Sequence, residues 1–177
     1  MKIVVIYGSP RRNGSSRYLG KKFIEGLKEN NNEVIEFDAC LKKVGSCLAC
    51  DYCKKNGKCV QNDDMQELYP HLLDADVICF SSPLYYFGLT SQIKKVIDRF
   101  YAYNDKLTGN KKTVLLLTSG GEKERNVEGC LLEFELFNEY LNYENIDLVY
   151  APNVSNLDDL LNTEYPNCAY ELGKKIK

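Results

Sequence analysis

The sequence predicts an α/β fold in which five parallel strands form one sheet covered by helices on both faces. Two observations lead to this prediction. Five short apolar runs recur along the 177 residues, and the segments between them carry apolar side chains at helical spacing. Alternating strands and helices of this kind give a parallel sheet with right-handed crossovers. The length fits one domain, and residues 1–177 contain no linker or repeat that would divide it.

The expected strands are apolar at nearly every position, as strands buried on both faces are. They cover residues 3–7, 34–37, 77–81, 114–118 and, with a weaker pattern, 148–151. Helices are expected at residues 15–28, 65–73, 91–103, 127–143 and 166–175. Pro70 could kink the second of these helices, and Asp63 or Asp64 is expected to cap its start.

Composition narrows the class of protein. The formal net charge is −2, with 23 Lys and Arg against 25 Asp and Glu, so the clustered positive charge that nucleic acid binding needs is missing. No apolar run reaches the length of a membrane span. Residues 1–7 lead directly into a polar turn, without the apolar stretch and cleavage site of a signal peptide. We expect a cytoplasmic protein that binds neither nucleic acid nor membrane.

A polar turn with two glycines follows the first expected strand. Residues 8–16 read Gly-Ser-Pro-Arg-Arg-Asn-Gly-Ser-Ser and lead into the first expected helix. Unpaired N–H groups and the positive end of the helix dipole meet at such a helix start, which makes it an anion site. Ser9, Asn13, Ser15 and Ser16 add side-chain donors for a phosphate monoester. The alternative is a polar turn whose Ser or Asn only caps the helix.

Three other phosphate-binding loops do not fit this turn. A Walker A loop reads G-x-x-x-x-G-K-[ST], whereas five residues separate Gly8 from Gly14 here and Ser15 follows. The dinucleotide fingerprint G-x-G-x-x-G is absent. The turn also lacks the cysteine that a loop phosphatase would use as its nucleophile.

The loop after the third expected strand is unusually aromatic. Residues 81–90 read Ser-Ser-Pro-Leu-Tyr-Tyr-Phe-Gly-Leu-Thr. In a doubly wound sheet of order 2-1-3-4-5, strands one and three are neighbours whose following helices cover opposite faces, so their loops part and leave a crevice. Backbone of residues 83–88 would border a cofactor ring there, with Tyr85, Tyr86 or Phe87 packed against it. The alternative is that these aromatics belong to the core or to a subunit contact.

Taken together, these loops make the chain similar to a known family. The similar segments are residues 8–11, 13–16, 82–86, 94–99 and 118–121, each of them weak alone. With them the sequence resembles, from Lys2 to about Tyr140, the NADPH-dependent FMN reductase and iron-sulfur flavoprotein branch of the flavodoxin-like superfamily. The resemblance implies a flavodoxin-like three-layer sandwich that binds flavin mononucleotide (FMN) at the carboxyl edge of its sheet.

The resemblance also assigns roles to individual residues. It implies that the FMN phosphate is held by Ser9, Arg11, Asn13, Ser15 and Ser16. It implies that the ribityl chain and ring contact Pro83, Leu84, Tyr85 and Tyr86, together with Ser119, Gly120 and Gly121. Gly88 ends the stretch of loop backbone that is expected to border the ring. Family members are typically homodimers or homotetramers in which a neighbouring subunit helps to cover the flavin, and an oligomer is expected here on that basis.

Four of the eight cysteines lie close together in the non-periodic segment 39–62, which follows the second strand. Cys47, Cys50, Cys53 and Cys59 have the spacing C-x2-C-x2-C-x5-C. Short, turn-rich spacing lets thiolates converge on one centre. The spacing matches the compact motif of iron-sulfur flavoproteins, and this resemblance implies that the four residues hold a [4Fe-4S] cluster. Cys40 lies just upstream of this group, whereas three further cysteines stand singly within expected strands or helices and are expected to be small buried hydrophobes, namely Cys79, Cys130 and Cys168.

Three other interpretations of the cysteines stay open. Zinc bound by four cysteines usually uses two C-x-x-C pairs that lie farther apart. The thiols could instead form reversible disulfides, or the segment could bind nothing. Because the segment follows the second strand, it should emerge at the same edge as the flavin loops, where a cluster and FMN could exchange electrons.

The expected function is that of an FMN-dependent oxidoreductase or electron-transfer flavoprotein. Its partners would be small-molecule or protein electron donors and acceptors, with NAD(P)H as a candidate co-substrate. Without a cluster, an NAD(P)H-dependent FMN or quinone reductase is expected. Two further functions stay open, namely a non-enzymatic electron carrier and a regulatory protein with an empty crevice. No catalytic side chain is assigned, since the cofactor supplies the chemistry.

Overall fold

The sheet consists of five parallel strands in the order β2-β1-β3-β4-β5. The strands are β1 (Lys2–Tyr7), β2 (Glu33–Asp38), β3 (Val77–Pro83), β4 (Lys112–Thr118) and β5 (Glu144–Ala151). This computed structural model describes residues 1–177, and it confirms the predicted flavodoxin-like order. The carboxyl ends of β1 and β3 are therefore neighbours, at the point where the chain switches direction across the sheet.

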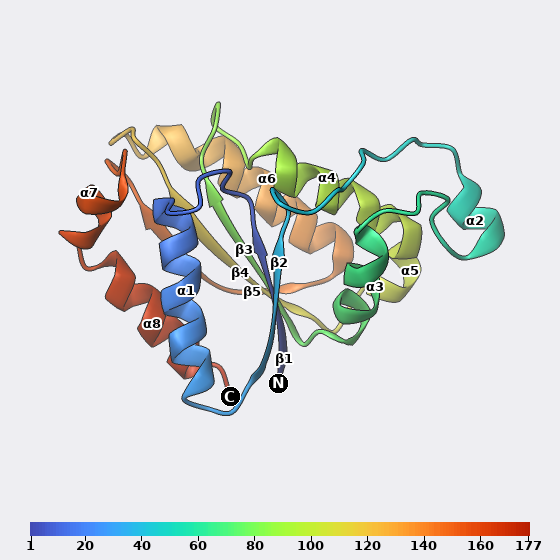
Figure 1. Cartoon of the computed structure of the whole chain (residues 1–177), viewed down its shortest axis with the longest axis horizontal. Helices are drawn as coiled ribbons and strands as arrows, with labels where there is room; N and C mark the ends of the chain where they lie inside the picture. The colour runs from blue at the N-terminus through green and yellow to red at the C-terminus, as the bar shows by residue number, and fades with distance from the viewer.

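Helices cover both faces of the sheet, as Figure 1 shows. One face carries α1 (Ser15–Lys28), α7 (Leu157–Leu161) and α8 (Tyr165–Lys175). The other carries α3 (Met65–Asp74), α4 (Ser91–Arg99) and α6 (Arg125–Leu141), with the 3₁₀ helix η1 (Phe100–Tyr103) and α5 (Asn104–Leu107) after α4. The short helix α2 (Tyr52–Asn56) projects beyond them. None of these helices combines the length and the apolar character that crossing a bilayer requires.

Side chains of the central strands alternate between two core clusters. Val4 and Ile6 of β1 belong to the cluster that includes buried residues of α3, α4 and α6, whereas Ile3 and Val5 belong to the cluster that includes those of α1 and α8. All four are completely buried. A strand buried on both faces must be apolar at every position, which explains why the first and third strands were predictable as apolar runs.

Several helix boundaries differ from the prediction. The helix expected over 91–103 is α4 followed by η1, and α5 begins directly after that range. A single 3₁₀ turn also places residues i and i+3 on one side, so the apolar pattern does not distinguish it from an α-helix. Helix α6 covers Arg125–Leu141 rather than 127–143 and ends at Asn142, whose φ of +54° is left-handed. Helices α2 and α7 have five residues each, too few for a periodic pattern to predict.

Two aspartates lie at the start of α3, and one of them bonds to the helix backbone. Asp64 is the N-cap residue, but its side chain makes no capping hydrogen bond. Asp63 accepts the N–H of Met65 at 3.2 Å, so one member of the predicted pair does bond the start of the helix. Pro70 lies inside α3, which continues through it to Asp74.

Helices α1 and α8 approach each other closely. A Cβ atom on Gly26 would lie 2.0 Å from the carbonyl oxygen of Tyr170, and one on Gly173 would lie 2.1 Å from the carbonyl oxygen of Phe23. Real Cβ atoms do not come so near to backbone atoms. Glycine is therefore required at both positions, and the contact fixes the axis of α1 against the sheet.

Candidate functional site

A cleft lies at the carboxyl edge of the sheet, where the loops after β1, β3 and β4 meet the segment after β5. Its volume is about 260 Å³. Nine of the predicted cofactor-contacting residues line it: Ser9, Arg11, Ser15, Ser16, Pro83, Leu84, Tyr85, Ser119 and Gly120. The fold thus brings together residues that are separated by more than a hundred positions in the sequence.

Four other predicted residues do not line this cleft, namely Asn13, Tyr86, Gly88 and Gly121. Tyr85 and Gly88 exchange two backbone hydrogen bonds of 3.1 Å, which folds the aromatic loop into a tight turn. Tyr86 and Phe87 lie at its tip with left-handed φ angles of +46° and +67°. The Tyr86 side chain is 100% exposed, so it packs against no other part of this chain.

The start of α1 offers unpaired donors to the cleft. The first backbone bond of the helix runs from Tyr18 to Gly14, so the N–H groups of Ser15, Ser16 and Arg17 have no acceptor in the chain. The N-cap is Gly14 with no side-chain cap bond, which argues against a turn that merely caps the helix. The first turn contains no acidic residue, so an anion meets no repulsion there.

The hydroxyl group of Ser16 is the clearest indication that the start of α1 binds a ligand. Ser16 is 1% exposed, and its Oγ has no hydrogen-bond partner. A buried hydroxyl that finds no partner costs free energy, and native proteins rarely leave one unpaired. A phosphate group at the start of α1 would accept from this hydroxyl and from the free N–H groups together. The residues present fit a phosphate.

Two arginines fasten the turn after β1. Arg17 pairs with Asp38 of β2 at 2.6 Å and donates from Nη2 to the carbonyl oxygen of Ser9 at 3.1 Å. Arg11 donates from Nη1 to the carbonyl oxygen of Ser155 at 3.1 Å, so it closes the rim toward the segment after β5. Sequence reasoning missed Arg17, although it directly follows the phosphate-loop serines.

Hydrogen bonds between the loops hold the cleft open before any ligand binds. Ser81 donates from Oγ to the carbonyl oxygen of Ser16 at 2.7 Å, and the N–H of Leu84 donates to the carbonyl oxygen of Thr118 at 2.8 Å. On the far wall, the N–H of Val154 donates to the carbonyl oxygen of Ser119 at 2.7 Å. The cleft is therefore preformed, as small-molecule sites usually are.

The four clustered cysteines line one small, mostly apolar cavity. Cys47, Cys50, Cys53 and Cys59 all border it, and its volume is about 20 Å³. Left-handed backbone at Ala49, Asp51 and Gly57, with φ of +50°, +53° and +67°, turns the chain around it. No three His, Cys, Asp or Glu side chains lie close enough together to hold a metal ion in this arrangement. The thiols converge without forming a closed coordination sphere.

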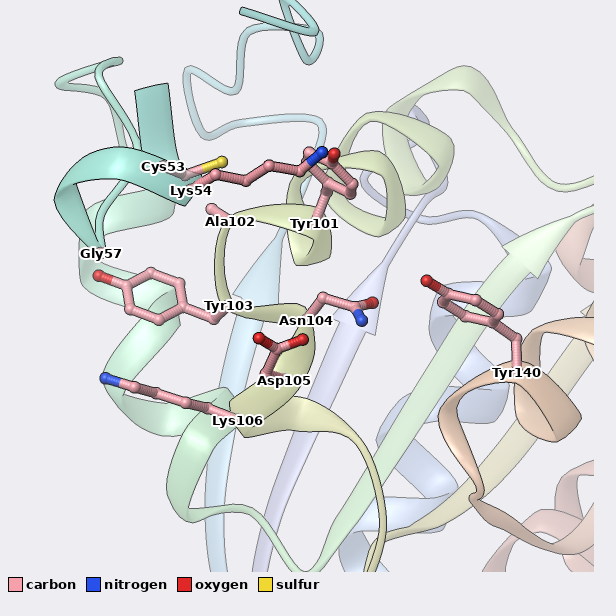
Figure 2. A pocket seen from close by; sticks show the side chains of 10 residues that line it. All are labelled: Cys53, Lys54, Gly57, Tyr101, Ala102, Tyr103, Asn104, Asp105, Lys106 and Tyr140. Carbon is pink, nitrogen blue, oxygen red and sulfur yellow. The ribbon is translucent and has the colours of Figure 1, made fainter. Parts of the chain in front are cut away.

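A larger cleft of about 560 Å³ adjoins the cysteine cavity. Figure 2 shows Cys53 and Lys54 of α2 close to Tyr101 of η1, with Tyr140 of α6 across the opening. Lys54 Nζ lies 5.2 Å from the centroid of the Tyr101 ring and 3.3 Å from an Asp51 carboxylate oxygen. Cys53 lines both cavities, so its thiol is the one that links the cysteine cavity to this cleft.

The cysteine segment does not stay at the carboxyl edge. It starts there after β2, but Figure 1 shows α2 at the end of the molecule away from α1 and α7. The cysteine cavity and the cleft at α1 share no lining residue. The expected side-by-side arrangement of the two sites within one chain is therefore not what the fold provides.

The single cysteines have varied surroundings. Cys79 and Cys130 are fully buried, and burial raises the pKa of the Cys130 thiol to about 12. Burial and the nearby Asp38 raise the pKa of half-buried Cys40 to about 11. Cys168 is exposed on α8, so for that residue the prediction of a small buried hydrophobe is wrong.

Comparison with known proteins identifies the relatives of this chain. The family model described as NADPH-dependent FMN reductase matches residues 1–128. An iron-sulfur flavoprotein of Methanocaldococcus jannaschii is 34% identical over 150 residues, which cover 80% of this chain and 74% of that protein. An iron-sulfur flavoprotein of Archaeoglobus fulgidus is 34% identical over 133 residues, which cover 74% of this chain. The match spans only 60% of that relative's own length.

A solved structure shares the fold at low identity. The NAD(P)H:quinone oxidoreductase from Methanothermobacter marburgensis aligns with a TM-score of 0.74 and 18% identity, covering 99% of this chain and 98% of that one. At this identity the likeness establishes the fold, and the site rests on the residues described above.

Proposed function

The chain belongs to the NADPH-dependent FMN reductase family, and from that premise we propose that it is an FMN-dependent oxidoreductase of the iron-sulfur flavoprotein type. The observation that carries the proposal is the buried, unpartnered Ser16 hydroxyl beside the free N–H groups of α1. That donor set suits a phosphate monoester. Bound FMN would supply two-electron redox chemistry, which protein side chains lack.

Each wall of the cleft has its own task in this proposal. Ser9, Ser15 and Ser16 would hold the phosphate, with Arg11 at the rim. The cleft of about 260 Å³ is slightly below the range of about 300–1,000 Å³ typical of small-molecule pockets. We propose that it takes the phosphate and ribityl chain, and that the flavin ring lies toward Pro83, Tyr85 and Gly120 at its mouth.

A second subunit would complete the cover over the ring. Tyr86 and Phe87 are exposed at the tip of the aromatic loop, and Leu132, Leu136 and Tyr140 form an exposed stripe along α6. A Cβ atom on Gly129 of α6 would lie 3.6 Å from the carbonyl oxygen of Phe87, so the loop tip adjoins that helix. Contiguous exposed apolar side chains mark protein interfaces, and we propose a homo-oligomer through this surface.

The cysteine segment would carry the one-electron side of the function. Cys47, Cys50, Cys53 and Cys59 supply the four thiolates that a [4Fe-4S] cluster needs, and they already surround one cavity. Since that cavity and the FMN cleft share no lining residue, we propose that electrons pass between sites of neighbouring subunits or to a separate protein.

The electron donor we propose is NAD(P)H, with a small molecule or a protein as acceptor. The family is that of the NADPH-dependent FMN reductases, and the structural neighbour is an NAD(P)H:quinone oxidoreductase, which supports a nicotinamide donor. All eight cysteines are free, which suits the reducing cytoplasm in which we place the protein.

The first experiment is anaerobic purification followed by an absorption spectrum and assays of iron and acid-labile sulfide. We expect flavin bands with about four irons per chain. Cys53→Ser should lose the iron and keep the flavin, while Cys168→Ser, which changes an exposed thiol elsewhere, should keep both. Flavin without iron in the unmodified protein would indicate an FMN-dependent reductase that has no cluster. Absence of both flavin and iron would overturn the proposed redox function.

Turnover separates an enzyme from an electron carrier. The FMN-loaded protein should oxidise NADPH or NADH in steady state when a quinone or free flavin is the acceptor. Absence of turnover with both nucleotides, combined with rapid reduction by a ferredoxin, would instead identify a non-enzymatic carrier.

A further inference from the structure

Arg99, the last residue of α4, is a buried cation beside the cysteine cavity. Its side chain is 1% exposed, and it lines the same cavity as the four clustered cysteines. Burying a guanidinium is costly unless its charge is paired and its donors are used. The groups that pair with the charge and the N–H donors of Arg99 therefore indicate the role of this residue.

The guanidinium joins Gly45 to Asp63, and the four clustered cysteines lie between these two residues. Nη1 donates to the carbonyl oxygen of Gly45 at 3.0 Å and to Asp63 Oδ2 at 2.7 Å, while Nη2 donates to Asp63 Oδ1 at 3.1 Å. Asp63 Oδ2 also accepts the N–H of Gly45 at 2.9 Å. Gly45 stands just before Cys47, and Asp63 stands just after Cys59. These bonds close the segment into a loop at its base.

One nitrogen of Arg99 has no hydrogen-bond partner. This nitrogen is Nε, and it is buried. An arginine has five N–H donors, and a buried one left unpaired costs free energy. Four thiolates around a cluster are anionic, and the groups that surround such a centre normally supply hydrogen bonds and compensating charge. A positive side chain with a free donor suits that place.

We propose that Arg99 and Asp63 are positioning residues that close the cysteine segment and that the charge of Arg99 stabilises the [4Fe-4S] centre held by the four cysteines. The charge role rests on the proposed function. The closure is a property of the metal-free chain and does not depend on it. Neither residue ligates iron, so both act through the placement and surroundings of the thiolates.

Limited proteolysis of the metal-free protein tests the closure. The trypsin sites between Gly45 and Asp63 are Lys54, Lys55 and Lys58. Asp63→Asn and Arg99→Gln should raise the cleavage rate at these sites about tenfold or more, which corresponds to a loss of about 1.4 kcal/mol in the closing equilibrium. Equal cleavage rates in these variants and the unmodified protein would overturn the closure.

Lys111→Gln is the matched control for this measurement. Lys111 is another buried cation, 7% exposed, whose Nζ donates to the carbonyl oxygens of Leu73 and Ala75 at 2.8 and 2.9 Å. It lies at the amino edge of the sheet, just before β4. Its removal lowers global stability without touching the segment. Cleavage in this variant that rises as much as in Arg99→Gln would show that general destabilisation is the cause, and would overturn the closure.

The iron-loaded protein tests the charge role. Removing a group that surrounds metal ligands typically lowers metal affinity by about 10–100-fold, and we expect this loss to appear as iron loss to a chelator that is about 10–100-fold faster in Arg99→Gln. Arg99→Lys keeps the charge but not the planar fork, so its rate of iron loss should lie between those of the unmodified protein and Arg99→Gln. The cluster's reduction potential should be lower in Arg99→Gln than in Arg99→Lys, because reduction adds negative charge that the cation stabilises. FMN affinity should be equal in all of these proteins.

These experiments distinguish a failure of the role proposed for Arg99 from a failure of the proposed function. If iron-loaded Arg99→Gln has the same rate of iron loss and the same cluster reduction potential as the unmodified protein, the charge role is overturned and the proposed function stands. Unmodified protein that binds FMN but no iron would overturn the cluster and the charge role together. The proteolysis result would then still decide the closure.

Discussion

Thr90 donates a hydrogen bond from Oγ1 to the carbonyl oxygen of Gly8 at 2.9 Å, and this bond ties the start of α4 to the end of β1. The two loops that form the cleft are thereby joined where they leave the sheet. A Cβ atom on Gly8 would lie 2.6 Å from both Thr90 Oγ1 and Ile93 Cγ1, so the contact leaves no room for a side chain. The shape of the cleft depends on this junction.

Gly8→Ala should therefore lower both stability and FMN affinity. Overpacking of this kind costs about 1–3 kcal/mol in the free energy of unfolding, which urea titration would measure. Gly129→Ala in α6 is the control, because a Cβ atom there meets no atom nearer than 3.6 Å and alanine favours a helix. That control should be as stable as the unmodified protein or more so. A Gly8→Ala protein of unchanged stability would contradict the tight junction.

Ser16→Ala should weaken FMN binding without harming the fold. Loss of a hydrogen bond to a charged group costs about 1.5–3 kcal/mol, or roughly 10–150-fold in the dissociation constant, which flavin fluorescence would measure. The ligand-free protein should keep or slightly gain stability, since the hydroxyl removed has no partner. Riboflavin, which lacks the phosphate, should bind both proteins equally. An equal loss of affinity for riboflavin would place Ser16 away from the phosphate.

The ion pair between Asp63 and Arg99 should make the metal-free protein lose stability in acid. Burial opposes ionisation, but hydrogen bonds from Arg99 and from the Gly45 N–H hold the pKa of Asp63 below its ordinary value of 3.8. A lowered pKa in the folded state means that the pair stabilises above about pH 4 and that this contribution is lost as pH falls through the folded pKa.

Asp63→Asn isolates that contribution. At pH 7 the variant should be less stable by about 3–5 kcal/mol, the usual cost of removing one partner of a buried pair. The difference between the two proteins should shrink as the pH of the urea titration is lowered below about 4. A difference that is constant from pH 7 to the acid end would show that the carboxylate charge of Asp63 does not carry the effect.

Leu136→Lys should dissociate the proposed oligomer. Leu136 lies in the middle of the exposed apolar stripe on α6, where a buried lysine charge is costly in an interface. Analytical ultracentrifugation should show a smaller particle, with the circular dichroism spectrum unchanged. Lys21→Glu, an exposed change on α1 on the opposite face of the sheet, should leave the particle size unaltered. An unchanged particle in both variants would exclude this surface as the interface.

The sequence was informative wherever burial leaves only one choice of residue type. β1 and β3 are apolar because both of their faces are covered, and this apolar pattern allowed us to predict both strands and the crevice between the loops that follow them. β5 is an edge strand whose first residues are exposed, so the polar positions Glu144 and Asp147 hid its start. The pairing of β5 with β4 also shifts register between residues 113 and 114, which no pattern in the sequence indicates.

Other parts of the site depend on contacts that no local pattern encodes. Val154 and Ser155 reach the cleft only because the chain turns back after β5, and their short polar segment carries no motif. The spacing of the cysteines predicted convergence, and the four do share one cavity. Spacing could not predict that α2 lies far from the flavin loops, since this follows from the path of a non-periodic segment.

The glycine contact between α1 and α8 joins two stretches of sequence that could otherwise diverge independently. Gly26 lies inside the segment that defines the family, whereas Gly173 lies well beyond residue 128. A descendant that acquires a side chain at either position must shift one helix away from the other, and α1 carries the phosphate donors at its start. Substitutions at these two sites are therefore expected to co-vary. Selection for cofactor affinity should then also act on Gly173, near the end of the chain.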